Sequence, residues 1–238
     1  QAQANGDLGE VCYPRWNGEA QQSRMAVLYC PDGLGEWPSL RERYPVNERR
    51  FRRIREKYRQ SVFSALSSSS GAIISAETFG HLFTAEHAAK LRKDLESVGF
   101  EDFHSVLYVR DPADYYLSIA QQSLKMSDIP PLVKDPASFK YDFRRIAETW
   151  EQVFPGRLIL RAFPSDPDHD VVEDFCGIVQ QQMAVALPPV QVRKNTTLSA
   201  EGMQILQNYR LRYSQDDGGR LTPDAARLAR FLSEATPN

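Results

Sequence analysis

Residues 105–122 read SVLYVRDPADYYLSIAQQ, and this stretch decides the fold. The apolar run 104–110 predicts a strand, because its Val, Leu and Tyr side chains suit a buried sheet. Pro112 then stands where a helix begins, since the first helical turn does not use the N–H that proline lacks. Arg110 is therefore expected at the carboxyl end of a strand, and Ser118 about two turns into the following helix.

Two more apolar runs of strand length, residues 72–77 and 156–163, alternate along the chain with helical patterns. Strands rich in Ile, Val and Leu that alternate with helices are typical of a parallel α/β sheet with both faces covered. Apolar spacing and capping residues predict helices over 47–66, 84–97, 139–154, 171–183 and 199–213, and a last one with Thr222 as cap and Pro223 in the first turn. The sequence shows no repeat or long linker. It predicts one domain, 1–238, with an irregular segment 1–45 and C-terminal helices in 199–238.

The composition is that of an ordinary globular protein. Of the 238 residues, 42% are hydrophobic and 25% are charged, and the formal net charge is −2. A weakly acidic chain has no overall positive field to attract nucleic acid, so any anion site must be local. No apolar run approaches the roughly 20 residues of a membrane-spanning helix, and no segment resembles a signal peptide.

The cysteines give no sign of a shared site. Cys12, Cys30 and Cys176 are odd in number and widely spaced, which argues against a disulfide framework and against a zinc site. The sequence therefore predicts no metal site and a reduced, cytoplasmic setting.

The predicted helix 47–66 has a strongly basic face. Its basic residues are Arg49, Arg50, Arg52, Arg53, Arg55, Lys57 and Arg59. This face is either a surface for an anion or acidic partner, or a solvated helix face relieved by Glu48 and Glu56.

Arg110 is placed where ligands bind in sheets of this kind, outside the carboxyl ends of the strands. A helix N-terminus at the same edge favours an anion, and the planar guanidinium suits phosphate oxygens. The alternative is that Arg110 pairs with Asp111 or Asp114 while Ser118 faces solvent.

The pattern YVRDPxDYYLSxxQQxxK over residues 108–125 resembles the 3′-phosphate-binding segment of sulfotransferases that use 3′-phosphoadenosine-5′-phosphosulfate (PAPS). The resemblance implies that Arg110 and Ser118 bind the 3′-phosphate of the donor. Residues 72–79, 139–163 and 194–206 are also similar to segments of bacterial carbohydrate-type members. The likeness covers roughly residues 60 to 210 in the expected order.

This family implies a P-loop-NTPase-like three-layer sandwich around a parallel sheet. Its 5′-phosphosulfate loop, Lys-x-Gly-Thr-Thr or similar, has no counterpart here, so the first strand and the phosphate loop are missing from the sequence. Because residues 6–14 resemble the Gly-x-x-Tyr-Pro that follows the family's first helix, the loop is expected before residue 1. Three explanations stay open: a truncated front, a degenerate member, or a strand supplied by another chain.

The resemblance also implies a His or Glu base near the acceptor. Glu77, just past a predicted strand, is the first candidate and His81 the second. The alternatives are that Glu77 is a helix cap or a buried hydrogen-bonded carboxylate, and that His81 packs on Phe79 and Phe83. His104 begins its strand at the opposite end of the sheet and is discounted.

Three more basic residues are candidates. Arg193 and Lys194 precede the Asn-Thr-Thr-Leu-Ser segment and match a loop that closes over the 3′-phosphate in several family branches. Lys125 lies on the same helical face as Ser118 and either lines the donor or acceptor cleft or faces solvent.

Three functions are compatible with these features. The first is transfer of a sulfuryl group from PAPS to a hydroxyl of a glycan or small molecule, with 3′,5′-adenosine bisphosphate as product. The second is a non-catalytic remnant that binds a nucleotide 3′-phosphate or a protein partner. The third is an unrelated α/β phosphotransferase. None of the three requires a nucleic acid or a membrane span.

Overall fold

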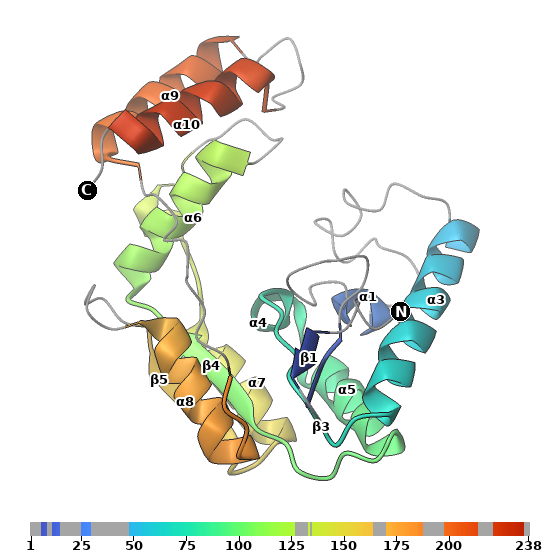
Figure 1. Ribbon diagram of the computed structural model, residues 1–238. Helices are drawn as coiled ribbons and strands as arrows, with labels where there is room; N and C mark the ends of the chain where they lie inside the picture. Colours follow the sequence, from blue (N-terminus) through green and yellow to red (C-terminus); the bar gives the residue numbers. More distant parts are fainter. Residues whose placement is uncertain are drawn as a thin grey trace. The chain divides into compact units, whose positions relative to one another are not determined.

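The computed structural model describes residues 6–8, 11–14, 25–29, 48–126, 133, 135–163, 170–187, 198–213 and 221–235. Over these residues the protein is mixed α/β and mostly helical (Figure 1). The chain divides into two compact units, each described by itself below. Unit 1 consists of Gln1–Tyr108, Asp142–Arg161 and Glu173–Pro188, and unit 2 of Val109–Tyr141, Ala162–Val172 and Pro189–Asn238. The single domain expected from the sequence stays a prediction.

A small mixed sheet joins the N-terminal part of unit 1 to the segment after residue 70. Its strands are β1 (Gly6–Leu8), β2 (Val11–Tyr13) and β3 (Gly71–Ala72). β1 pairs with β2 in antiparallel fashion, and β2 pairs with β3 in parallel. The N-terminal segment expected to be irregular therefore supplies two strands, as well as the short helix α1 (Met25–Tyr29).

The strand predicted over 72–77 is shorter in the structure. Only Ala72 of that range belongs to β3, although the amide N of Ile73 still donates to the carbonyl O of Cys12 at 2.9 Å. The carbonyl oxygens of Ala76 and Glu77 accept from the next turn of chain, where helix α4 (Thr78–Leu82) begins. The run ends as a strand because its last residues are already taken into a helical turn.

A second, separate pair of strands contains the stretch that opened the sequence analysis. β4 (Ser105–Val109) and β5 (Leu158–Ala162) are hydrogen-bonded neighbours. The amide of Ser105 donates to Arg157 at the start of β5, and the amide of Phe163 donates to Val109 at the end of β4, so the two strands run parallel. The described strands form two small sheets, so the predicted P-loop-like sandwich is not confirmed.

The helices follow the sequence prediction closely. The longer ones are α3 (Glu48–Ser67), α5 (Ala85–Ser97), α6 (Pro112–Met126), α7 (Phe143–Val153), α8 (Val171–Met183), α9 (Ala200–Tyr213) and α10 (Pro223–Ala235), with a single 3₁₀ turn, η2, at Pro136–Ser138. α7 begins later than predicted because the Asp142 side chain caps it by accepting from the amide of Arg145 at 2.9 Å.

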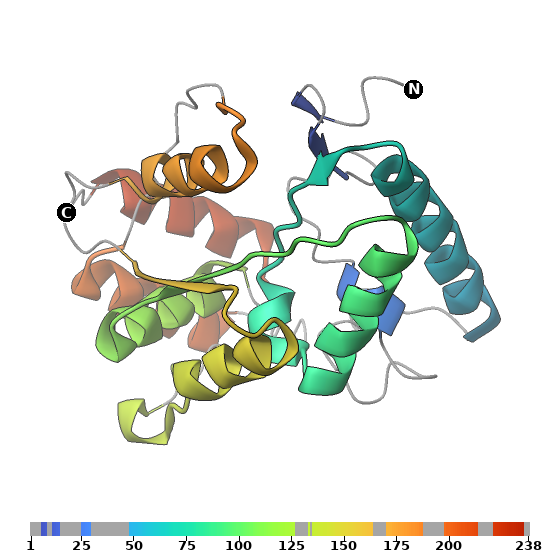
Figure 2. The ribbon, with the colours of Figure 1, turned by 90° about the horizontal axis from the view of Figure 1, so that it is seen from below.

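The core of unit 1 is built on one face of α3. Phe51, Tyr58, Val62 and Leu66 recur along that face, and each is at most 4% exposed. Helix α1 contacts both α3 and α5, and the three helices lie together in Figure 2. Across these helices Arg59 donates to both carboxylate oxygens of Asp94, at 2.8 and 2.7 Å. The hydroxyl of Tyr29 donates to the same carboxylate at 3.1 Å, which ties α1, α3 and α5 together.

Unit 2 packs α6, α9 and α10 around a second core, as the adjacent α9 and α10 in Figure 1 illustrate. Its buried apolar residues are Leu124, Leu198, Leu206, Ala229 and Leu232. Arg210 of α9 is 1% exposed and donates from Nη1 to the carbonyl oxygens of Ser123 and Leu124, at 3.0 and 2.8 Å. These carbonyls lie in the last turn of α6, where a cation complements the helix dipole.

The structure also bears on membrane-spanning helices, metal ligands and cysteines. In the described part of the chain no helix combines the length and the apolarity needed to cross a membrane. Nor do the described residues place three or more His, Cys, Asp or Glu side chains where they could hold a metal ion. Cys12 and Cys176 are free thiols, and burial raises the pKa of Cys12 above its usual value.

Candidate functional site

Arg110 follows the last residue of β4, as the sequence predicts. Its guanidinium carbon lies 5.1 Å from the ring centroid of Phe163, which follows the last residue of β5. The parallel pairing brings these two positions together, since both come directly after the carboxyl end of a strand. A guanidinium that rests on a ring is held through its flat face. The N–H groups at its edge keep the geometry that suits a phosphate or sulfate.

The charge of Arg110 is not neutralised by its acidic neighbours. Among the described residues Arg110 forms no ion pair with Asp111 or Asp114, which was the alternative left open by the sequence. The Asp111 carboxylate instead accepts from the amides of Ala113 and Asp114, at 2.8 and 3.3 Å. Asp111 is therefore the N-cap of α6.

The Asp111 cap corrects the expectation that the N-terminus of α6 binds an anion. Pro112 has no N–H, the amides of Ala113 and Asp114 are bound by the Asp111 side chain, and the amide of Tyr115 donates to the Asp111 carbonyl at 2.8 Å. The first turn of α6 thus keeps no donor for an external anion. An anion near Arg110 must be held by side chains rather than by the helix N-terminus.

Ser118 is half-buried in the second turn of α6. One turn further on, Gln121 accepts from the amide of Leu198 at 3.0 Å. Leu198 is 2% exposed and leads directly into α9. The segment that enters α9 is therefore fixed to α6 near Ser118. This contact between distant parts of the chain was not predicted from the sequence.

The other basic candidates are placed only in part. Lys125 lies in the last turn of α6, and burial lowers its pKa below the usual value for a lysine. Arg193 and Lys194 lie outside the described residues. Their suggested role over the 3′-phosphate stays a prediction.

The two candidate bases belong to unit 1. Glu77 is exposed and precedes α4, but its carboxylate makes no capping hydrogen bond, so neither structural alternative is observed. His81 lies in α4, and its side chain is outside the described residues. At the end of α4 the rings of Phe79 and Phe83 pack together, with their centroids 4.5 Å apart. The centroid of the His87 ring lies 5.8 Å from that of Phe83. The structure thus brings Arg110 and Ser118 into one unit and places Glu77 and His81 in the other.

A polar cluster on β4 and β5 was not predicted. The hydroxyl of Tyr108 donates to the Asp174 carboxylate at 2.6 Å, and Arg161 lies 3.6 Å from the other oxygen. Burial, with the nearby Asp174 as a second cause, raises the pKa of Tyr108 well above its usual value. Tyr108 lies two residues before Arg110, but its partner Asp174 on α8 is distant in the sequence. No local pattern therefore predicts this hydrogen bond.

Comparisons with models of protein families, with curated proteins and with solved structures find no match to this chain.

Proposed function

We propose that the protein binds the 3′-phosphate of PAPS through Arg110 and Ser118 and takes part in sulfuryl transfer to a hydroxyl of a glycan or small molecule. The observation that carries the proposal is the state of Arg110. Its guanidinium rests on Phe163 at the end of a strand pair, while the adjacent Asp111 is used as a helix cap. A cation held by its face, with no described carboxylate partner, is suited to an oxyanion ligand.

The hydrogen bonds at the start of α6 favour a 3′-phosphate that is bound by two side chains, Arg110 and Ser118. Because the amides of the first turn of α6 are bound by Asp111, the ligand would depend on the Arg110 guanidinium and on a hydroxyl of the same segment, that of Ser118. Hydrogen bonds to charged groups contribute about 1.5–3 kcal/mol each. Loss of Arg110 should therefore dominate the loss of affinity, with Ser118 contributing less.

The transfer step requires a base. The acceptor oxygen forms a bond to sulfur as the bond from sulfur to the bridging oxygen of PAPS breaks, which leaves 3′,5′-adenosine bisphosphate. The base that accepts the proton of the acceptor hydroxyl stays a prediction from the sequence, with Glu77 as the first candidate and His81 as the second. The sequence contains no Lys-x-Gly-Thr-Thr loop, so the proposal assigns to this chain only the 3′-phosphate half of the donor site.

The alternative function is binding of 3′,5′-adenosine bisphosphate through Arg110 and Ser118 without transfer of sulfate. Incubation with PAPS labelled in the sulfuryl group, together with a mixture of glycan acceptors, separates the two functions. Label in the acceptor supports the transferase, and binding without transfer supports the non-catalytic protein.

Calorimetric titration with 3′,5′-adenosine bisphosphate tests the site itself. Arg110→Ala should weaken binding by at least about 2 kcal/mol, or roughly 30-fold. Arg157→Ala is the matched control, because Arg157 precedes β5 at the opposite end of the strand pair and pairs with Asp102 at 3.2 Å. The control should bind as the wild type does. Equal affinity of Arg110→Ala and wild type would remove Arg110 from the site.

A further inference from the structure

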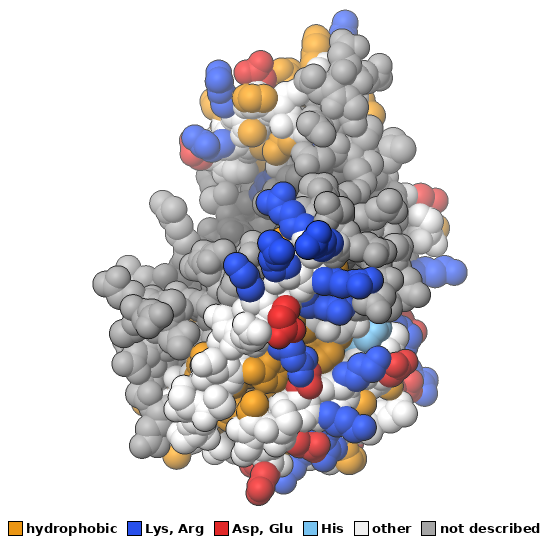
Figure 3. Space-filling model, turned by 90° about the vertical axis from the view of Figure 1, so that its right-hand side faces the viewer, with side chains coloured by type: hydrophobic (Ala, Val, Ile, Leu, Met, Phe, Trp, Pro, Cys, Tyr) orange, Lys and Arg blue, Asp and Glu red, His pale blue; other side chains and the backbone are white. Residues whose placement is uncertain are grey.

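Helix α3 carries a basic surface. Arg49, Arg53 and Lys57 are exposed and stand four residues apart, on consecutive turns of one face. The three positions span about 12 Å along the helix axis. Figure 3 shows that Lys and Arg side chains gather on the side of the molecule that presents α3, with few carboxylates among them.

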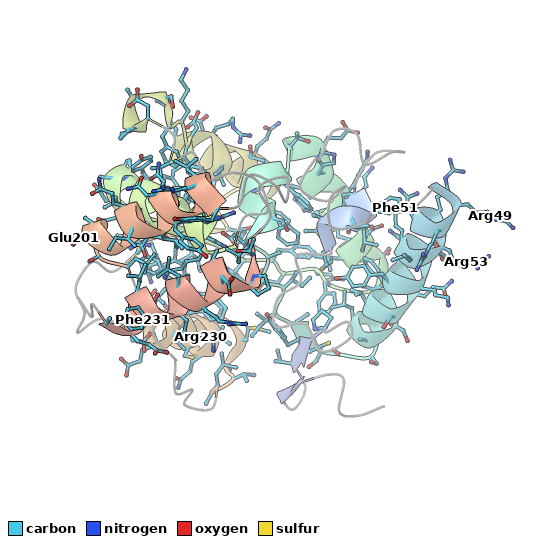
Figure 4. All side chains as sticks on the ribbon, turned by 90° about the horizontal axis from the view of Figure 1, so that it is seen from above. Arg49, Phe51, Arg53, Glu201, Arg230 and Phe231 are labelled. Atoms are coloured by element: carbon cyan, nitrogen blue, oxygen red, sulfur yellow. The ribbon has the colours of Figure 1, made fainter. Side chains whose placement is uncertain are left out.

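These side chains are directed outward by the packing of α3. Phe51, Tyr58, Val62 and Leu66 hold the opposite face against the core of unit 1. Figure 4 shows Phe51 turned toward the protein, while Arg49 and Arg53 extend away from it. The buried face fixes the rotation of the helix, so the cations are presented as a row on a rigid support.

The charges of this row are not used within unit 1. Arg59 illustrates the contrast, because both oxygens of Asp94 neutralise it at 2.7 and 2.8 Å. Over the residues that the structure describes, Arg49, Arg53 and Lys57 form neither ion pairs nor hydrogen bonds with side chains. Three adjacent cations repel one another, with Glu56 as the described carboxylate on the same face, and an external polyanion would relieve that repulsion.

We propose that this row, Arg49, Arg53 and Lys57, binds an anionic polysaccharide through its sulfate or carboxylate groups. The inference does not depend on the proposed sulfuryl transfer, since it rests on α3 alone. It implies that the protein associates with glycans that carry acidic groups.

The composition of the face favours a polysaccharide over a nucleic acid. Of the aromatic residues of α3, Phe51 and Tyr58 are buried, and the ring of the half-buried Phe63 is covered by the Arg59 guanidinium, whose carbon lies 4.9 Å from the ring centroid. None of these rings is free as a platform for an unpaired base. Glu56 is exposed within the face and accepts from Gln60 at 2.9 Å. A carboxylate there opposes the continuous phosphate row of a nucleic acid, whereas a polysaccharide presents uncharged hydroxyls between its anionic groups.

The same face is poorly suited to a lipid bilayer. Peripheral helices that bind membranes combine basic residues with exposed apolar anchors. The large hydrophobic side chains exposed in the described structure are Leu117, Leu160, Ile205, Tyr213 and Phe231, none of which belongs to α3. Charge without an apolar anchor is the chemistry of a surface for a soluble polyanion.

The test compares two triple variants of the full chain. Arg49→Gln/Arg53→Gln/Lys57→Gln removes the row. Arg144→Gln/Arg230→Gln/Lys93→Gln is the matched control, which removes two arginines and one lysine from exposed positions of α7, α10 and α5. Binding of a heparin dodecasaccharide is measured by calorimetry at several salt concentrations. Far-ultraviolet circular dichroism and thermal melting check that both variants keep the wild-type fold.

The row variant should lose at least tenfold in affinity, and the control should stay within about twofold of the wild type. Each released counterion contributes about 0.7–0.9 to the slope of log K against log salt, so that slope should fall by about two to three in the row variant. A desulfated, N-acetylated dodecasaccharide should bind more weakly than heparin to the wild type.

Three results would overturn the proposal: no heparin binding by the wild type, equal losses in the two variants, or tighter wild-type binding of a 12-base-pair duplex or of phosphatidylserine vesicles. Titration with 3′,5′-adenosine bisphosphate keeps the two proposals separate. The row variant should bind it as the wild type does, because Arg110 and Ser118 belong to unit 2.

Discussion

Replacement of Arg210 by methionine removes the cation that caps the C-terminus of α6. Nη1 of Arg210 donates to the carbonyl oxygens of Ser123 and Leu124, and the side chain is 1% exposed. Two hydrogen bonds from a charged donor contribute about 1.5–3 kcal/mol each, and their sum is reduced by the cost of burying the guanidinium. Methionine replaces the aliphatic part of the arginine side chain and lacks its guanidinium. We therefore expect Arg210→Met to lower the free energy of unfolding of unit 2 by about 3 kcal/mol.

Amide hydrogen exchange of α6, α9 and α10 measures this loss within unit 2. A decrease of about 3 kcal/mol accelerates exchange of the most protected amides roughly 150-fold, since each 1.4 kcal/mol is a factor of ten. Arg212→Met on the same helix is the control, because Arg212 is exposed and contacts the ring of Tyr213 at 5.5 Å. The control should change the free energy by less than about 0.5 kcal/mol. A loss below about 1 kcal/mol in Arg210→Met would refute the reasoning.

Three more predictions follow from individual contacts. Burial and Asp94 raise the pKa of Tyr29 above its usual value of 10.0, so above that pH the folded protein keeps a proton that the unfolded chain loses. The free energy of unfolding should therefore fall as the pH rises above about 10. Urea titration at several pH values should show a smaller decrease of that free energy in Tyr29→Phe. Gly99 ends α5 with φ +101° and open space around it, so Gly99→Ala should cost about 1 kcal/mol in thermal unfolding through backbone strain alone. Asp111→Ala should cost about 1 kcal/mol as a lost cap and, by removing an anion beside Arg110, should tighten binding of 3′,5′-adenosine bisphosphate; weaker binding would contradict that account.

Local signals in the sequence predicted most helices. Thr84 caps α5, and Gly99 follows its end with a positive φ, as expected from their residue types. Thr222 accepts from the amide of Ala225 at 3.2 Å at the start of α10. Such signals are reliable because a cap depends on only a few neighbouring residues.

The sheets were predicted less well because strand pairing is not local. The run 72–77 is apolar enough for a strand, yet only Ala72 pairs with β2 before the chain turns toward α4. Its partner, Val11–Tyr13, lies in a segment whose prolines and glycines pointed to irregular structure. A pairing across some sixty residues leaves no periodic pattern in either partner.

In the candidate site, too, local features could be predicted from the sequence and contacts between distant residues could not. The position of Arg110 at a strand end followed from the apolar run before it and the proline after it. The capping role of Asp111 was not predicted, although an aspartate directly before a proline is a typical helix start. The ring of Phe163 beneath Arg110 and the bond from Leu198 to Gln121 depend on tertiary packing, which no local pattern reports.

The central claim is that Arg110 recognises a 3′-phosphate. The most direct test is a cycle of four calorimetric affinities, with wild type and Arg110→Ala each titrated with 3′,5′-adenosine bisphosphate and with adenosine 5′-monophosphate. The account predicts that the wild type prefers the bisphosphate and that Arg110→Ala loses at least about tenfold of that preference, or 1.4 kcal/mol of coupling. The same preference in both proteins would contradict the assignment of Arg110 to the 3′-phosphate.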